Sequence, residues 1–219
     1  MSDVQIVSTV EAPQIVSNKS LQSFTLDDLA PYTREREFAS GSSVDFRLFC
    51  VGRDDVHNIL KHIFSRISIS LYLNMFGYDD DELNDIIWQK VLDPHIVTLI
   101  TLDKSQAGGV HEKKLLEVNR AKDLSLFNTH FVVGQSATHQ ISHTKGFVAD
   151  GIVGGEGSTN WSNSGEGTFV VTGHPGGVGY KAQNNTQTIF TGPKELAMFS
   201  AQLLSEHTIA QRQAEAHAQ

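Results

Sequence analysis

The middle of the chain contains a histidine and a lysine at a spacing that suits chemistry on phosphate. His143 and Lys145 are separated by one residue, so on a strand both side chains would project from the same face. The lysine ammonium would stabilise the charge of a phosphate oxyanion, and the histidine imidazole would attack phosphorus or transfer a proton. The pair therefore predicts a site for phosphoryl chemistry.

A second polar segment follows after Asp150 and offers further groups for phosphate oxygens. Gly157 would let the backbone approach a ligand closely, while Ser158 offers a hydroxyl and Asn160 an amide. These donors would hold a phosphodiester without a metal ion, so no metal and no other cofactor is expected. The alternative is that the histidine and the lysine belong to a buried polar network and that the second segment is only a turn.

The whole pattern, His-x-Lys-x4-Asp-x6-Gly-Ser-x-Asn from His143 to Asn160, resembles the signature of the phospholipase D superfamily at every specified position. The resemblance implies that the catalytic residues are His143, Lys145 and Asp150. It also implies that Lys145, Ser158 and Asn160 bind the substrate phosphate. His143 would attack phosphorus and form a phosphohistidine intermediate.

Members of this family often carry an Asn-x-Glu element whose carboxylate orients the nucleophilic imidazole. The nearest equivalent here is Asn185-Thr186-Gln187, so Gln187 is the expected orienting residue. An amide accepts a hydrogen bond from the imidazole but supplies no negative charge. Activation of the nucleophile is therefore where this chain departs most from the family pattern.

The chain contains one complete motif, whereas the family's active site requires two. A second His-x-Lys sequence occurs at His111 and Lys113, but Val118 stands where the aspartate would be. Single-motif members complete the site by symmetric dimerisation. The resemblance thus implies a homodimer in which two copies of His143 face each other.

The activity implied by the resemblance is that of a metal-independent phosphodiesterase. A nuclease acting on DNA or RNA is the leading hypothesis, because small single-motif members of the family are mostly nucleases. A lipid hydrolase of the phospholipase D type is one alternative. A regulated nuclease subunit of a larger assembly, such as a prokaryotic defence complex with a regulatory protein partner, is another.

Composition limits the setting in which this chemistry would occur. The 219 residues carry a formal net charge of −8, which argues against non-specific binding of nucleic acid through bulk charge but not against a local basic cleft. Cys50 is the single cysteine, so an intramolecular disulfide is excluded and a reducing compartment is expected. With neither a signal-peptide pattern nor an apolar run of membrane-spanning length, we expect a cytoplasmic protein without a membrane anchor.

Apolar periodicity predicts alternating strands and helices before the motif and shorter strands after it. The expected strands are 44–51, 67–76, 95–102, 126–133, 140–148, 151–153, 168–172 and 186–191, and the expected helices are 54–67, one that starts at 79–82, 110–122 and one from Pro193. This order, together with the resemblance, predicts a phospholipase D-like α/β sandwich with a mixed, largely parallel central sheet flanked by helices.

The chain is divided into an N-terminal arm that is weakly ordered or contacts another subunit (1–43), a phospholipase D-like catalytic domain (44–210) and a polar tail (211–219). The glycine-rich segment 166–183 is expected to be a lid or a contact surface beside the cleft, or else a passive hairpin.

Two further groups of ionisable residues are assigned to structure rather than to chemistry. The carboxylates at 79–82 suit the positive end of a helix dipole, with a metal site as the alternative. The histidines assigned to surface or core packing are His57, His62, His95, His111, His130 and His139.

Overall fold

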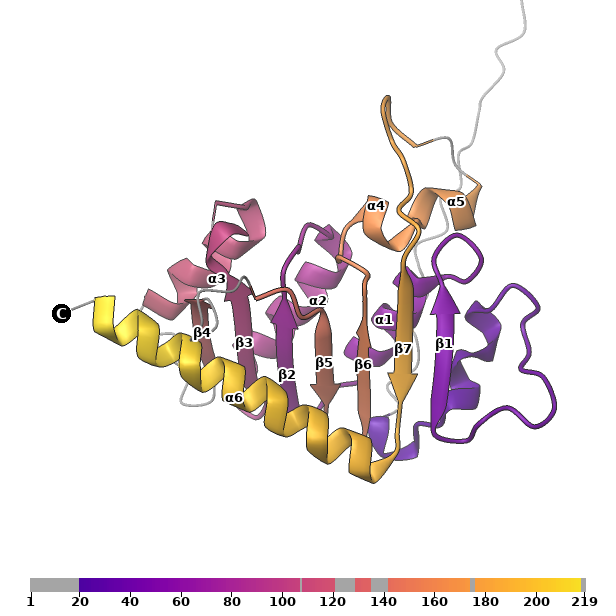
Figure 1. The fold of residues 1–219 in the computed structure, drawn as a ribbon, viewed down its shortest axis with the longest axis horizontal. Coiled ribbons are helices and arrows are strands. Elements are labelled where there is room, and N and C mark those ends of the chain that lie inside the picture. Colours follow the sequence, from indigo (N-terminus) through magenta and orange to yellow (C-terminus); the bar gives the residue numbers. More distant parts are fainter. Residues whose placement is uncertain (1–19, 107, 121–128, 135–141, 174–175, 218–219) are drawn as a thin grey trace, which may run out of the picture.

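The computed structural model describes residues 20–106, 108–120, 129–134, 142–173 and 176–217 (Figure 1). Its strands are β1 (Phe46–Cys50), β2 (Ser70–Met75), β3 (Val97–Asp103), β4 (Thr129–Gly134), β5 (Gly146–Ala149), β6 (Val153–Gly157) and β7 (Thr186–Phe190). Its α-helices are α1 (Val56–Phe64), α2 (Asp81–Leu92), α3 (Val110–Arg120), α4 (Asn163–Glu166), α5 (Thr168–Thr172) and α6 (Pro193–His217). Short 3₁₀ helices are η1 (Leu21–Ser23), η2 (Leu26–Tyr32) and η3 (Lys104–Gln106).

The strands form one mixed sheet in the order β1-β7-β6-β5-β2-β3-β4. Pairs β2–β3 and β3–β4 are parallel. The other pairs in this part of the chain are antiparallel, so the mixed α/β sandwich is confirmed but parallel pairs are the minority. Strands β5 and β6 are joined by the tight turn 150–152, and so short a connection permits only antiparallel pairing.

Helices cover both faces of the sheet. Figure 1 shows α6 running across the front of the strands, with α1 and α2 behind them. Alternate residues of β5 point to opposite faces, so Phe147 packs in the core on the α1 side while Val148 packs with Leu196 and Leu203 of α6. The two faces of one short strand therefore belong to two separate apolar clusters.

Helix α1 follows from its sequence. Its buried residues Val56, Ile59, Leu60 and Ile63 recur at helical spacing, and the carboxylate of Asp55 caps the first turn by accepting a hydrogen bond from the Asn58 amide at 3.1 Å.

Residues 20–32 lie against this helix. Leu21, Phe24, Leu26 and Leu29 are buried in the same core as α1, and the Tyr32 hydroxyl lies 3.0 Å from Nδ1 of His62. Residues 1–19 are outside the described part of the chain, and the division into arm, domain and tail stays a prediction.

Two elements differ from their predicted form. Residues 168–172 form helix α5 instead of a strand, because Gly167 and Gly173 at φ 67° and 70° turn the chain at each end of one helical turn. Helix α6 continues to His217, beyond the start of the predicted tail. Among the described residues, we find no helix whose length and apolar character would let it cross a membrane.

Candidate functional site

His143 and Lys145 lie just before β5, and both side chains contact Phe76. The ring centroids of His143 and Phe76 are 4.7 Å apart, and Nζ of Lys145 lies 5.2 Å from the centroid of the same ring. His143 is exposed, whereas Lys145 is only 3% exposed. The imidazole thus faces solvent with an ammonium buried beside it.

The charge of Lys145 is not matched by a carboxylate among the described residues. Its Nζ donates a hydrogen bond of 2.9 Å to the backbone oxygen of His143, and burial lowers the pKa of its ammonium. A buried cation with only a neutral partner is a favourable place for a phosphate oxygen to bind.

Lys145, Gly157 and Gln187 lie in a row across neighbouring strands. The amide of Gly157 donates to the backbone oxygen of Lys145 at 3.3 Å, and Gly157 pairs with Gln187 in the β6–β7 register. A Cβ at Gly157 would lie 2.1 Å from the Thr186 oxygen, so this position accepts only glycine. The sheet therefore brings the motif lysine and the predicted orienting glutamine to the same level.

Gln187 is fully buried and only partly hydrogen-bonded. Its Nε2 donates to the Thr188 oxygen at 3.2 Å, while Oε1 has no hydrogen-bond partner among the described residues. Oε1 can therefore still accept a hydrogen bond. No contact between Gln187 and His143 is seen, so the orienting role stays a prediction.

Ser158 fixes the segment after β6 to the start of β7. Its hydroxyl donates to Oδ1 of Asn185 at 3.0 Å and accepts from the Thr186 amide at 3.1 Å. The Ser158 hydrogen is therefore directed at Asn185, and a phosphate would have to compete for it.

Asn160 lies against the segment that follows β2. A Cβ at Gly77 would lie 2.9 Å from Cγ of Asn160, so the missing side chain makes room for the amide. The Trp161 amide donates to the Gly77 oxygen at 2.9 Å, which joins the two segments. Since Phe76 precedes Gly77, this contact places Asn160 against the same segment that His143 contacts.

Asp150 lies at the opposite end of β5 from Lys145. Its carboxylate accepts backbone hydrogen bonds from Ile69 at 2.8 Å, Ser70 at 2.9 Å and Ser68 at 3.1 Å, and its own φ is 52°. These contacts fix the turn before β2. The structure therefore brings Asp150 together with backbone amides and not with the other motif residues.

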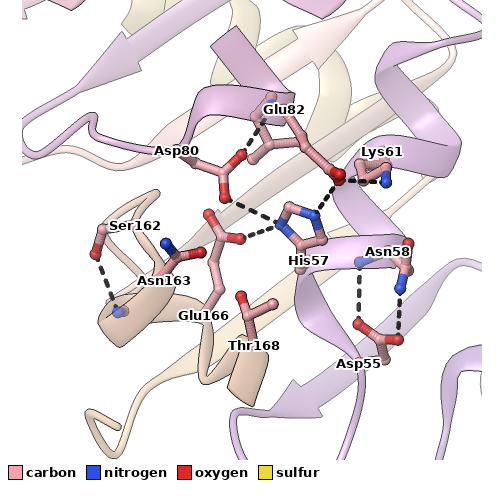
Figure 2. Close-up of polar contacts among 12 residues, drawn as sticks. Asp55, His57, Asn58, Lys61, Asp80, Glu82, Ser162, Asn163, Glu166 and Thr168 are labelled. Atoms are coloured by element: carbon pink, nitrogen blue, oxygen red, sulfur yellow. Dashed lines mark hydrogen bonds and ion pairs between the residues drawn. The ribbon is translucent and has the colours of Figure 1, made fainter. Parts of the chain in front are cut away.

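A second ionisable cluster lies close to this site, and Figure 2 shows its side chains converging from α1, α2 and α4. Nδ1 of His57 is 2.6 Å from Oε2 of Glu166 and 3.2 Å from Oδ2 of Asp80. Nε2 of His57 is 2.9 Å from Oε2 of Glu82, which also forms an ion pair with Lys61.

Burial and hydrogen bonding act in opposite directions on this cluster. Burial by itself would lower the pKa of His57, but its hydrogen bonds to Asp80 and Glu166 raise that pKa to about 10. Burial raises the pKa of Glu166 to about 7, and the nearby Asp80 carboxylate adds to this effect. Two buried carboxyl groups, Asp80 and Glu166, thus lie beside a single group that can carry positive charge, the imidazole of His57.

The sequence did not indicate this cluster. The sequence pattern places His57 in packing and Asp80 at the start of a helix, with a metal site at 79–82 as the alternative, and Asp80 does cap α2 by accepting a hydrogen bond from the Leu83 amide at 2.7 Å. Glu166 carried no signal, because 109 residues separate it from His57.

No family model and no curated protein matches the chain. Among solved structures it is similar to Nuc, a phospholipase D family member from Salmonella typhimurium, with 13% identity and a TM-score of 0.53 over 75% of this chain and 96% of that one. NucT from Helicobacter pylori gives 14% identity and a TM-score of 0.55 over 75% and 98%. Phosphatidylserine synthase from Haemophilus influenzae gives 14% and 0.50 over 72% and 35%. This chain therefore has the fold of the phospholipase D superfamily.

Proposed function

We propose that this protein is a phosphodiesterase that cleaves nucleic acid with His143 as its nucleophile. One observation carries the proposal: an exposed imidazole lies beside a buried ammonium, Lys145, that has no carboxylate partner in the described part of the chain. That combination suits attack on a phosphodiester whose non-bridging oxygens carry negative charge.

The proposed reaction has two steps. First, Nε2 of His143 attacks phosphorus and the bond to the leaving oxygen breaks, while His143 of the partner subunit gives that oxygen its proton. Then the partner's His143 takes a proton from water, the water oxygen attacks phosphorus, and the bond between phosphorus and His143 breaks. Lys145 and Asn160 stabilise the non-bridging oxygens in both steps, and Oε1 of Gln187 accepts a hydrogen bond from the nucleophilic ring.

A symmetric homodimer is part of this proposal, because one chain supplies a single His143 and the reaction uses two. Mixing wild-type chains with an excess of His143→Asn chains should therefore lower the activity per wild-type chain as mixed dimers form. Activity that stays proportional to the amount of wild-type chain would contradict the shared site. Cleavage by protein that sediments as a monomer would contradict it as well.

Nucleic acid is the preferred substrate class because of the size of the chain. The alignment spans nearly all of Nuc and NucT but 35% of phosphatidylserine synthase, so this chain corresponds in size to Nuc and NucT. A phospholipase-type lipid substrate is tested beside nucleic acid in the same experiment.

The test compares wild-type protein with His143→Asn and with His95→Asn, which changes an exposed histidine before β3. Each protein is incubated with labelled single- and double-stranded DNA and RNA and with phosphatidylcholine vesicles, with and without EDTA. We expect cleavage of a nucleic acid in EDTA by wild type and His95→Asn, and none by His143→Asn.

A radiolabelled phosphoryl group that remains on wild-type protein after denaturation, and is released by acid, would identify the phosphohistidine. Cleavage that stops in EDTA and returns with magnesium would contradict the metal-free reaction. Cleavage of vesicles alone would replace the nuclease by the lipid hydrolase.

A further inference from the structure

We propose that His57, Asp80 and Glu166 bind one zinc ion inside the protein, next to the segment that carries Asn160. The proposal is independent of the phosphodiesterase activity, because this ion would not touch the substrate. It concerns a set of side chains that the proposed reaction does not use.

The three donors come from separate parts of the fold and meet in the interior. His57 lies on α1, Asp80 precedes α2 and Glu166 ends α4, and one ligand atom from each lies within 4.8 Å of the other two. The side chains of His57, Asp80 and Glu166 are 7%, 3% and 0% exposed. One imidazole and two carboxylates, with water as a fourth ligand, supply nitrogen and oxygen donors of the types that zinc accepts.

The second nitrogen of His57 is held as a metal-bound histidine usually is. Nε2 lies 2.9 Å from the Glu82 carboxylate, and Lys61 in turn pairs with Glu82. Such an outer carboxylate fixes the ring orientation and makes the ligating nitrogen more basic. With Nε2 occupied by Glu82, Nδ1 is the atom that would bind the ion, and it would release its proton to solvent on doing so.

Glu166 supplies an independent indication of a missing ligand. Its side chain is fully buried, its Oε2 contacts His57, and its Oε1 has no hydrogen-bond partner in the described part of the chain. Figure 2 shows this carboxylate turned toward Asp80 and His57. A buried carboxylate oxygen without a donor is costly, and a cation between the two carboxylates would satisfy it.

The donor set selects among cations. Magnesium and calcium prefer oxygen ligands only, so the imidazole disfavours them. Zinc accepts nitrogen and carboxylate oxygen together at about 2.0 to 2.2 Å. Binding would widen the 2.6 Å separation between His57 Nδ1 and Glu166 Oε2, because two ligand atoms of a tetrahedral zinc ion lie about 3.3 Å apart.

The ion would brace the segments that shape the phosphate site. Asp80 follows the segment 76–79, and Glu166 follows the segment 158–162; these two segments are joined by the hydrogen bond from the Asp79 amide to the Trp161 oxygen at 2.7 Å. Zinc would join their far ends to each other and to α1. We therefore infer a structural ion that stabilises the fold around Asn160.

The experiment measures zinc binding directly. Chelator-treated full-length protein is titrated with zinc sulfate by calorimetry, with magnesium and calcium chloride as competitors. We expect one tight site per chain, a higher melting temperature with zinc, and no displacement by magnesium or calcium. Glu166→Gln and His57→Asn should lose the tight site, and Glu82→Gln should weaken it by roughly 10- to 100-fold.

Two matched variants test whether the site is specific. His111→Asn changes a second histidine–carboxylate pair, in which Nε2 of the buried His111 lies 3.1 Å from the 93%-exposed Asp81 side chain, and it should bind zinc like wild type. His143→Asn should also retain the site, which separates zinc binding from catalysis. Tight binding that survives Glu166→Gln and His57→Asn, or that disappears in His143→Asn, would overturn the proposal.

Crystals of zinc-loaded wild-type protein give a test that does not depend on whether a variant folds. An anomalous peak at the zinc edge between His57, Asp80 and Glu166 would support the site. An anomalous map without a peak at that position would refute it, whatever the calorimetry shows.

Discussion

Nζ of Lys145 donates a 2.9 Å hydrogen bond to the backbone oxygen of His143, which links the side chain of one motif residue to the main chain of the other. The bond orients the ammonium but does not neutralise it, because a carbonyl carries no net charge. A substrate phosphate would therefore meet a cation that is already positioned and has little solvent to displace.

Replacing Lys145 by methionine tests this relationship. We expect kcat/KM on a simple aryl phosphodiester to fall by about 10²- to 10³-fold, since one charge-stabilising donor is lost. The melting temperature should not fall, because a buried cation without a carboxylate partner is removed. Lys194→Met, at an exposed position in α6, is the control. Full activity of Lys145→Met would exclude the lysine from the reaction.

Asp150→Ala should affect stability rather than chemistry. Its carboxylate accepts backbone hydrogen bonds from Ser68, Ile69 and Ser70, and losing them should lower the free energy of unfolding by about 2 kcal/mol. Urea unfolding and cleavage assays well below the melting temperature separate the two effects. A folded Asp150→Ala protein without activity would instead support the catalytic role that the family resemblance implies.

Gln187→Leu should raise or preserve stability while lowering activity. Leucine removes Oε1, a buried oxygen that has no hydrogen-bond partner among the described residues, at nearly constant volume. If Oε1 orients the nucleophile, the cleavage rate should fall by at least about tenfold. Thermal melting and initial rates measure the two effects; a variant that is as active as wild type would leave Gln187 a packing residue.

The lowered pKa of His62 leads us to expect that the folded protein loses stability in weak acid. Burial, assisted by the nearby Arg66, lowers the pKa of His62 from 6.5 to about 4. Between pH 6.5 and 4 the unfolded chain binds a proton that the folded chain excludes, so the free energy of unfolding falls as the pH falls. His62→Gln should make urea midpoints less dependent on pH in this window. His95→Gln should not, and an unchanged slope in His62→Gln would refute the assignment.

The sequence predicts the elements whose signals are local. A cap and an apolar stripe define α1, and alternation defines β2, because every residue involved lies within one element. The strand predicted at 168–172 is wrong for the same reason: its β-branched residues favour a strand, but the flanking glycines at positive φ override that preference. Local propensity decides the type of an element only where the residues that flank the element permit that conformation.

The candidate site shows more clearly what a sequence motif does not predict. The motif gives the order of His143, Lys145 and Asp150 along the chain but not that β5 separates the aspartate from the other two. The partners of Asp150 lie at 68–70, where the chain enters β2, and they reach Asp150 only through the antiparallel pairing of β2 with β5. The cluster at His57 likewise depends on contacts across 109 residues, which no spacing rule contains.

The pairing of β1 with β7 has a consequence for synthesis of the protein. Phe46 opposes Phe190 in this pair, so among the described strands β1 has no neighbour in the sheet until β7 has been made. Helix α6, which covers the face formed by β2 to β6, is made later still. Until β7 and α6 have been made, the nascent chain exposes an unpaired strand and an apolar sheet face, both of which favour aggregation, so its yield should depend on chaperones that bind such surfaces.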